Sequence, residues 1–336
     1  MIGDLTDAIR LAPQEAARVY RLRAMAYYRL QDLDRALSDA TSAVELGGNA
    51  ALDLALRSQI LAARHEPDRA IDDLDAAVRV NPRLADLYVL RADARRAKSD
   101  KDRALADLET AIRIDPTNAQ HAGALAWSRK GDLRYLSDEL DLAANSYDEA
   151  IRLDPGRAEF YSARAAILSA AGEAKRAAQD FAKALALAPN DPAVFGQRGV
   201  ARFAEGDFAG AAEDFSELSQ RAPNAYAAIW LYLARARAET AQNAGEADRL
   251  LMSVKSAAWP TPVVELLLGE RAADAVAGAA NGARQLCDAK FYVGQWFLLK
   301  DDRANASAAL EAAAANCPRD SAERRVAIAI LKRLKT

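Results

Sequence analysis

Few residues in this chain are of the types that carry chemistry. It contains two histidines, His65 and His121, and two cysteines. His65 lies at a predicted turn, and His121 stands at the start of a predicted helix. Neither histidine has a cysteine, a second histidine or an acidic cluster at the spacing of a metal site. We therefore expect solvated or locally bonded imidazoles, and no metal is predicted.

Other catalytic patterns are also missing from the sequence. It has no glycine-rich phosphate loop and no serine nucleophile elbow. Acidic residues are scattered beside basic ones, and Asp72, Asp73 and Asp75 are expected on the solvated face of a helix. We predict a non-enzymatic protein that binds no cofactor.

The bulk composition excludes two further classes of partner. The formal net charge is −3, so the sequence does not support a generic nucleic-acid or anionic-membrane surface. The chain has no apolar run of about 18 residues, and no membrane span is predicted. Proteins or peptides remain as the expected partners.

The two cysteines, Cys287 and Cys317, are thirty residues apart. Cys287 lies near the start of the first helix of a predicted antiparallel pair, and Cys317 follows the end of the second helix. The two thiols therefore lie at the same end of the pair, and we predict a disulfide. A disulfide is typical of an oxidising compartment such as the periplasm. The alternative is two small buried hydrophobic side chains in a reducing cytoplasm.

A regular period organises most of the chain. An alanine is followed twelve residues later by a proline at Ala70/Pro82, Ala104/Pro116, Ala143/Pro155, Ala177/Pro189 and Ala211/Pro223. Successive alanines are equally spaced, except that the interval from Ala104 to Ala143 is five positions longer, and Ala36 with Gly48 extends the series backward. A period of about 34 residues predicts an all-α array of antiparallel helix pairs. The five extra residues are placed near 133–142, as a longer turn or helix or as a local contact device.

The 34-residue spacing becomes irregular after Pro223. Helices are predicted at 225–243, 246–257 and 270–280, followed by a variant helix pair. A last helix over 321–334, capped by Asp320, would close the array. We divide the chain into a repeat array over 1–256, with a truncated first repeat, and a variant hairpin with a capping helix over 257–336.

The helix pairs resemble the tetratricopeptide repeat (TPR) family over roughly residues 1–256. The resemblance rests on small residues in the first helices, the recurring alanines and large residues four positions after them, such as Leu74 and Phe181. It implies a superhelical solenoid whose first helices line a concave, protein-binding face. The lysine–asparagine clamp of some chaperone-binding members is not visible.

The tail, residues 257–336, resembles the NlpI-type bacterial TPR lipoproteins more narrowly. The match rests on Trp259-Pro260, Leu268-Gly269 and the run Phe291-Tyr292-Val293-Gly294. It implies a periplasmic adaptor for envelope proteases or cell-wall enzymes, often dimeric and anchored to the outer membrane. Because the chain begins inside a repeat, we expect an excised or processed piece, in which any signal or lipid anchor would lie upstream of residue 1. The alternatives are a cytoplasmic protein, or a scaffolding segment of a larger protein whose catalytic domain lies outside this chain.

The expected partner groove follows the concave positions of the first helices. Its predicted residues are Arg18, Arg21, Met25, Tyr28, Gln59, Asp86, Asp93, Arg96, Trp127, Lys130, Phe203 and Trp230. The aromatic residues would anchor an apolar peptide or partner helix. Replacing Trp127 and Trp230 with alanine is then expected to weaken partner capture more than stability, unless these rings pack between repeats. Arg18 and Arg21 would hold an acidic segment or lie on a solvated face.

Overall fold

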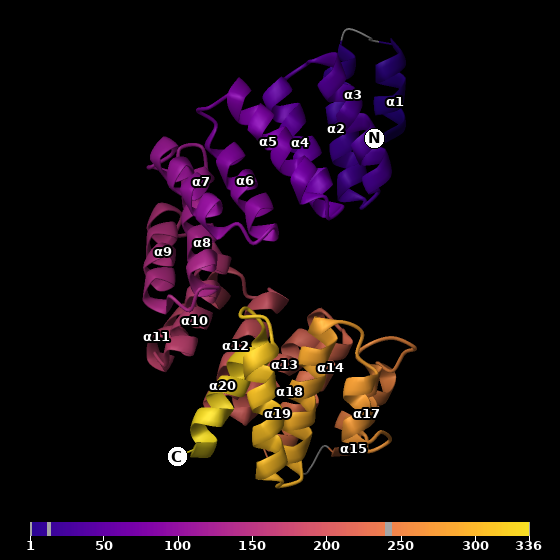
Figure 1. Ribbon diagram of the computed structural model, residues 1–336, viewed down its shortest axis with the longest axis vertical. Helices are drawn as coiled ribbons and strands as arrows, with labels where there is room; N and C mark the ends of the chain where they lie inside the picture. The colour runs from indigo at the N-terminus through magenta and orange to yellow at the C-terminus, as the bar shows by residue number, and fades with distance from the viewer. Residues whose placement is uncertain (1, 12–14, 239–243, 336) are drawn as a thin grey trace. The chain divides into compact units, whose positions relative to one another are not determined.

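The computed structural model describes residues 2–11, 15–238 and 244–335, and every regular element in these ranges is an α-helix (Figure 1). The predicted all-α fold is confirmed. The chain forms two compact units: unit 1 comprises residues 1–137 and 145–155, and unit 2 comprises residues 138–144 and 156–336.

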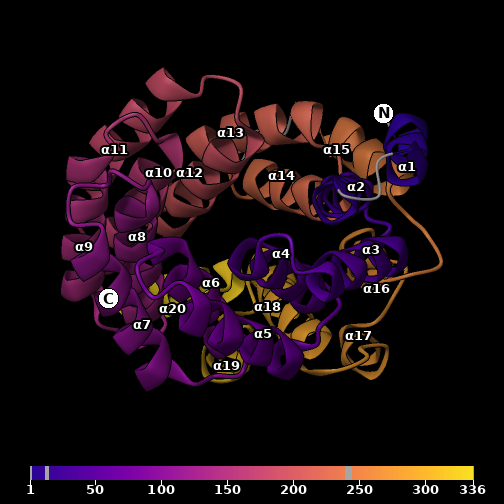
Figure 2. The ribbon, with the colours of Figure 1, turned by 90° about the horizontal axis from the view of Figure 1, so that it is seen from above.

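Unit 1 contains three complete helix pairs and parts of a fourth. Its helices are α1 (Ile2–Leu11), α2 (Ala16–Arg29), α3 (Leu33–Leu46), α4 (Ala50–Ala63), α5 (Pro67–Val80), α6 (Ala85–Ala97), α7 (Lys101–Ile114) and α8 (Ala122–Tyr135). We number the pairs α2/α3, α4/α5, α6/α7 and α8/α9 as repeats 1 to 4; α9 (Leu140–Leu153) is divided between the two units. Figure 2 shows α4 and α6 on the inner side of the curve of unit 1 and α5 and α7 on its outer side.

Unit 2 contains two further repeats and the variant tail. Its helices are α10 (Ala158–Ala171), α11 (Ala174–Leu187), α12 (Pro192–Glu205), α13 (Phe208–Arg221), α14 (Ala225–Arg237), α15 (Ala244–Ser253), α16 (Thr261–Leu267), α17 (Ala273–Gly278), α18 (Ala283–Leu299), α19 (Arg303–Asn316) and α20 (Ala322–Lys335). The pairs α10/α11 and α12/α13 are repeats 5 and 6.

Small residues and helix caps explain the regular pairs. The recurring alanines, such as Ala36, Ala70 and Ala104, are fully buried, which lets neighbouring helices approach closely. Asp32 and Asp100 accept hydrogen bonds from the backbone N–H three residues further on and so cap the helices that follow them.

A residue in the left-handed region closes the turn between the two helices of most repeats. These residues are Gln31, His65, Ser99, Gly172 and Gly206, with φ between 60° and 94°. His65, with φ 62°, is thus a turn residue, and its side chain is exposed.

The extra residues of repeat 4 lie mainly before its first helix, so the predicted position near 133–142 is wrong. Residues 115–121 link α7 to α8, whereas the equivalent linker before α6 is 81–84. The buried Asp115 stabilises the longer linker, because its carboxylate accepts hydrogen bonds from the backbone N–H groups of Ala122 and Gly123 at 3.0 Å. The turn after α8, residues 136–139, gains one residue over the turn at 98–100.

The compact units also differ from the predicted division at 256/257. Trp230, which precedes that boundary, shares one hydrophobic core with Val263, Phe291 and Ile330, which follow it. The tail and the last repeat therefore form one packed body, because the tail buries its apolar side chains against helices of the array.

Candidate functional site

An open hollow of about 580 Å³ lies on the inner side of unit 1, at the ends of the first helices of repeats 1 to 3. Its most buried lining residues, which form the floor, include Ala70, Leu74 and Ala94. The more accessible lining residues form the rim and include Tyr28, Gln59, His65, Asp93 and Arg96. A second hollow, along the turns of repeats 1 and 2, shares Ala63 and His65 with the first.

The hollow exists because repeat 2 carries small side chains where its neighbours carry large ones. Ala62 stands one repeat length after Tyr28 and one repeat length before Arg96, so the three occupy the same place in successive repeats. All three side chains line the hollow, and only the middle one ends at Cβ. The small side chain of Ala62 between the large ones of Tyr28 and Arg96 therefore leaves room for a side chain of a ligand.

Ion pairs already hold some charges near the hollow. Asp93 lies 3.2 Å from Nε of Arg129 and 3.8 Å from Nε of Arg96. Towards the other end of the inner face, Arg21 donates to the buried Asp53 at 2.8 Å. Arg96 is thus the arginine that lines the hollow, and its ion pair with Asp93 is loose.

Four predicted groove residues line this hollow: Tyr28, Gln59, Asp93 and Arg96. Arg18, Met25 and Asp86 are exposed on the same first helices but do not line it. Partial burial, with a smaller contribution from Asp115, raises the pKa of Asp86 above its ordinary value. Arg21 is held by its ion pair and is less available to an acidic segment than the sequence implied.

The prediction that Phe203 and Trp230 line the groove is wrong. Phe203 is fully buried, and Trp230 is 5% exposed. The Trp230 ring lies 5.4 Å from that of Phe291 and 6.2 Å from that of Tyr292, centroid to centroid. In unit 2, α20 packs against α12, so the tail covers surface that the same positions leave open in unit 1 (Figure 1).

Trp127 and Lys130 were assigned to the wrong places in their repeat. The groove prediction for both residues takes Ala126, 34 positions after Ala92, as the small residue of this first helix. Counting back twelve residues from Ala143 gives Gly131 instead, because the insertion precedes α8. Lys130 then lies over the Trp127 ring at 5.1 Å, as Arg91 lies over Tyr88 at 5.4 Å. The pair is thus equivalent to residues that pack within the repeat, not to groove residues, and Lys130 also pairs with Glu109 at 3.1 Å.

A ladder of buried ion pairs was missed in the sequence. An arginine of the first helix binds an aspartate sixteen residues later in the second: Arg23–Asp39, Arg57–Asp73, Arg91–Asp107, Arg164–Asp180 and Arg198–Asp214. Asp73 is therefore buried beside Arg57, and the expectation that it lies on a solvated face is wrong, whereas Asp72 is exposed. The signal was available, since each arginine directly precedes the small residue of its helix and each aspartate follows the recurring alanine by three.

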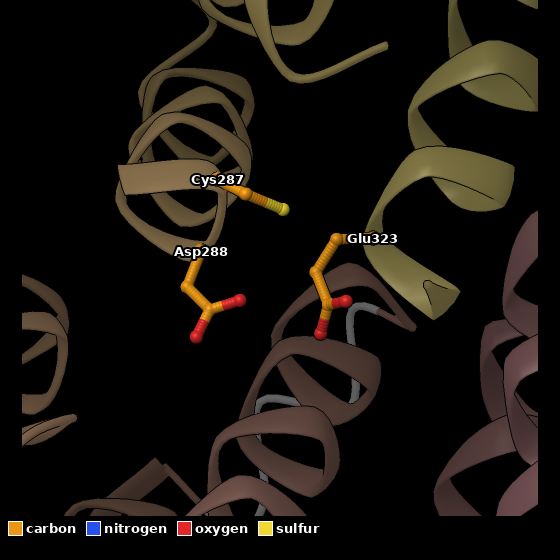
Figure 3. Close-up of side chains that lie close together, drawn as sticks. All are labelled: Cys287, Asp288 and Glu323. Atoms are coloured by element: carbon orange, nitrogen blue, oxygen red, sulfur yellow. The ribbon is translucent and has the colours of Figure 1, made fainter. Parts of the chain in front are cut away.

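The tail holds two buried carboxylates beside the cysteines (Figure 3). Potential ligand atoms of Cys287, Asp288 and Glu323 lie within 4.8 Å of one another, the one such group in the described ranges. The Cys287 sulfur is bonded to that of Cys317 at 2.09 Å, so it cannot bind a metal as a thiolate. The Arg284 guanidinium lies 3.5 Å from Asp288 and 3.2 Å from Glu323 and supplies the compensating charge.

We expect the unfolding of the tail to depend on the protonation of Glu323. Burial and, further, the carboxylate of Asp288 raise the pKa of Glu323 above its ordinary value of 4.5, against the opposing effect of Arg284. A carboxyl group with a raised pKa stabilises the fold below its unfolded pKa and loses that contribution as the pH rises through its folded pKa. The free energy of unfolding in urea should therefore change less between acid and neutral pH in Glu323→Gln than in the wild type. Parallel profiles would contradict this expectation.

The disulfide leads to a second expectation. Because the sulfurs of Cys287 and Cys317 are bonded to each other, neither cysteine should react with an alkylating reagent in freshly isolated protein, native or denatured, and both should react after reduction and denaturation. Mass spectrometry of the alkylated peptides measures this directly. Two alkylated cysteines in the unreduced denatured protein would show free thiols and remove this argument for an oxidising compartment.

Comparisons with known proteins support the fold. Residues 56–119 and 128–192 match the family model described as tetratricopeptide repeat. The chain therefore contains tetratricopeptide repeats, and its fold is an all-α TPR fold. No curated protein matches the sequence.

Solved structures similar to this chain include three TPR proteins. One from Parabacteroides merdae is 18% identical, with a TM-score of 0.53, and the match covers 76% of this chain and 98% of that one. A thermophilic TPR protein of Thermus thermophilus is 23% identical, with a TM-score of 0.46, and the match covers 53% of this chain and 95% of that one. YrrB, described as a TPR protein with an unusual peptide-binding site, is 21% identical, with a TM-score of 0.40. The match covers 56% of this chain and 94% of that one.

No helix in the described ranges is both long and apolar enough to cross a lipid bilayer.

Proposed function

We propose that this chain is a non-enzymatic adaptor that binds partner proteins or peptides in the concave groove of unit 1. The observation that carries the proposal is the open hollow between Tyr28, Ala62 and Arg96, on the inner side of a tetratricopeptide array. A concave site with an apolar floor and a few polar groups at its rim is the usual form of a ligand site.

We also propose a place in the bacterial cell envelope. The buried Cys287–Cys317 disulfide supports an oxidising compartment such as the periplasm. The resemblance of the tail to NlpI-type lipoproteins supports envelope proteases or cell-wall enzymes as partners, and a second copy of the chain as another. An anchor to the outer membrane would have to come from a segment upstream of residue 1.

Partner capture with a filled hollow tests the binding proposal. We expect Ala62→Leu to reduce the recovery of cross-linked partners from native cells by about tenfold, the effect of about 1.4 kcal/mol of lost binding free energy. Ala106→Leu makes the same change at an exposed position of α7 that does not line the hollow, and should recover partners as the wild type does. Equal recovery by Ala62→Leu and the wild type would contradict a partner site in this hollow.

A further inference from the structure

We infer that the hollow of unit 1 takes a large apolar side chain of a partner peptide, with an acidic side chain directly beside it in the peptide sequence. This inference rests on the proposed function and adds the chemical class of the partner. It follows from the burial of the lining residues and from the arrangement of charge at the rim.

The floor selects an apolar side chain. Ala70 and Leu74 are almost completely buried beneath the hollow, and Ala62, Ala63 and Ala97 have only methyl side chains around it. The buried polar side chain of the floor, Ser58, already donates its hydroxyl to the Ala55 carbonyl at 2.7 Å. A polar ligand group placed on this floor would therefore lose its water for little hydrogen bonding in return, which costs free energy. An aromatic or large aliphatic group gains roughly 25 cal/mol for each Å² of apolar surface that it removes from water.

One wall adds an aromatic contact. The half-buried Tyr28 borders the hollow on the side of repeat 1. Ring packing contributes free energy beyond the apolar area that is buried, so a phenylalanine side chain fits this wall particularly well.

The opposite wall selects the charge. The Asp93 carboxylate accepts a hydrogen bond from Arg129 Nε, and Arg129 also lies 3.7 Å from Asp132. In the described part of the chain, Arg96 has a single ion pair, from its Nε to Asp93 at the long distance of 3.8 Å, and its side chain is 46% exposed. The two terminal nitrogens of the Arg96 guanidinium thus keep their donor capacity for a ligand, and a carboxylate matches them in charge and geometry.

The other charged groups do not reverse this preference. Asp93, the acidic side chain that lines the hollow, is already shared between two arginines, so it offers little to a lysine of the ligand. Because Arg96 itself lines the hollow and an extended peptide advances about 3.3 Å per residue, the acidic residue that reaches Arg96 is the one next to the apolar residue.

Labelled octapeptides test the inference by fluorescence anisotropy with the full chain. The first peptide has glycine and serine flanks around a Glu-Phe-Glu core, the second has Lys-Phe-Lys, and the third has Glu-Ala-Glu. We expect the Glu-Phe-Glu peptide to bind at least about tenfold more tightly than either of the others, with an affinity that falls as salt is added.

Variants assign the effect to the two walls. Ala62→Leu should weaken Glu-Phe-Glu binding about tenfold, and Arg96→Glu should reverse the ranking of the glutamate and lysine peptides. Arg18→Glu makes the same charge change at an exposed position outside the hollow and should leave the ranking as it is. Circular dichroism shows whether each variant is folded, and all three positions are exposed.

Equal binding of the glutamate and lysine peptides would overturn the inference, and so would an unchanged ranking in Arg96→Glu. Absence of Glu-Phe-Glu binding at millimolar concentration would overturn it as well. If Ala62→Leu still loses its cellular partners under these outcomes, the proposed function stands and only the chemical class is wrong. If Ala62→Leu also keeps every partner, the proposed function fails.

Discussion

The Trp230→Ala variant is expected to lower the free energy of unfolding of unit 2 by about 3–5 kcal/mol, the usual cost of truncating a buried aromatic side chain. Trp230 packs against Phe203, Phe215 and Phe291, with ring centroids 5.3–5.5 Å away. Because this ring joins α14 to both α12 and α18, its loss should loosen the tail as well as the last repeat. Urea unfolding followed by far-ultraviolet circular dichroism measures the change.

Trp127→Ala provides the comparison for Trp230→Ala. Trp127 is only partly buried and keeps Lys130 over its ring, so its truncation should cost about 1 kcal/mol. The sequence pattern led to the opposite expectation, that both tryptophans serve partner capture more than stability. Equal and small losses of stability in the two variants would contradict the burial of Trp230 under the tail.

The second large effect is expected from the ladder of ion pairs. In Asp73→Ala the Arg57 guanidinium, whose side chain is 22% exposed, loses the carboxylate that binds it at 2.6 and 2.7 Å. Breaking a buried pair on one side leaves an uncompensated charge and costs about 3–5 kcal/mol. The Arg57 guanidinium cannot escape this cost by losing its proton, because arginine stays protonated in proteins.

Asp72→Ala is the matched control, since it removes an exposed carboxylate one residue away. It should change the free energy of unfolding by less than about 0.5 kcal/mol. The double variant Arg57→Met with Asp73→Leu should recover much of the lost stability, because replacing both partners by apolar groups avoids the buried charge. Equal effects of Asp72→Ala and Asp73→Ala in urea unfolding of unit 1 would contradict the ladder.

The repeat architecture could be predicted because its cause is local. Buried alanines such as Ala70 and Ala104 recur at fixed spacing, and the helix pairs follow directly from them. Repeat 4 was misplaced because two small residues, Ala126 and Gly131, fit the pattern equally well. The longer linker capped by Asp115 decides between them, and the spacing alone did not show it.

The candidate site could be predicted only where nothing covers the inner face. Tyr28, Gln59, Asp93 and Arg96 line the hollow, because no other helix of unit 1 covers their side of the first helices in the described residues. Phe203 occupies the equivalent row in unit 2, yet it is buried under the tail. The helices α12 and α20 are far apart in the sequence but pack against each other. The spacing of the repeats does not predict such contacts.

Site-specific photocross-linking tests the central claim most directly. A benzophenone amino acid placed at Gln59, in the hollow, and separately at the exposed Asp72, on the second helix of the same repeat, reports which face contacts partners in native cells. We predict partner adducts from position 59 that are lost when Ala62→Leu is added, and none from position 72. Adducts of the same partners from position 72 but not from position 59 would contradict a partner site in the concave groove of unit 1.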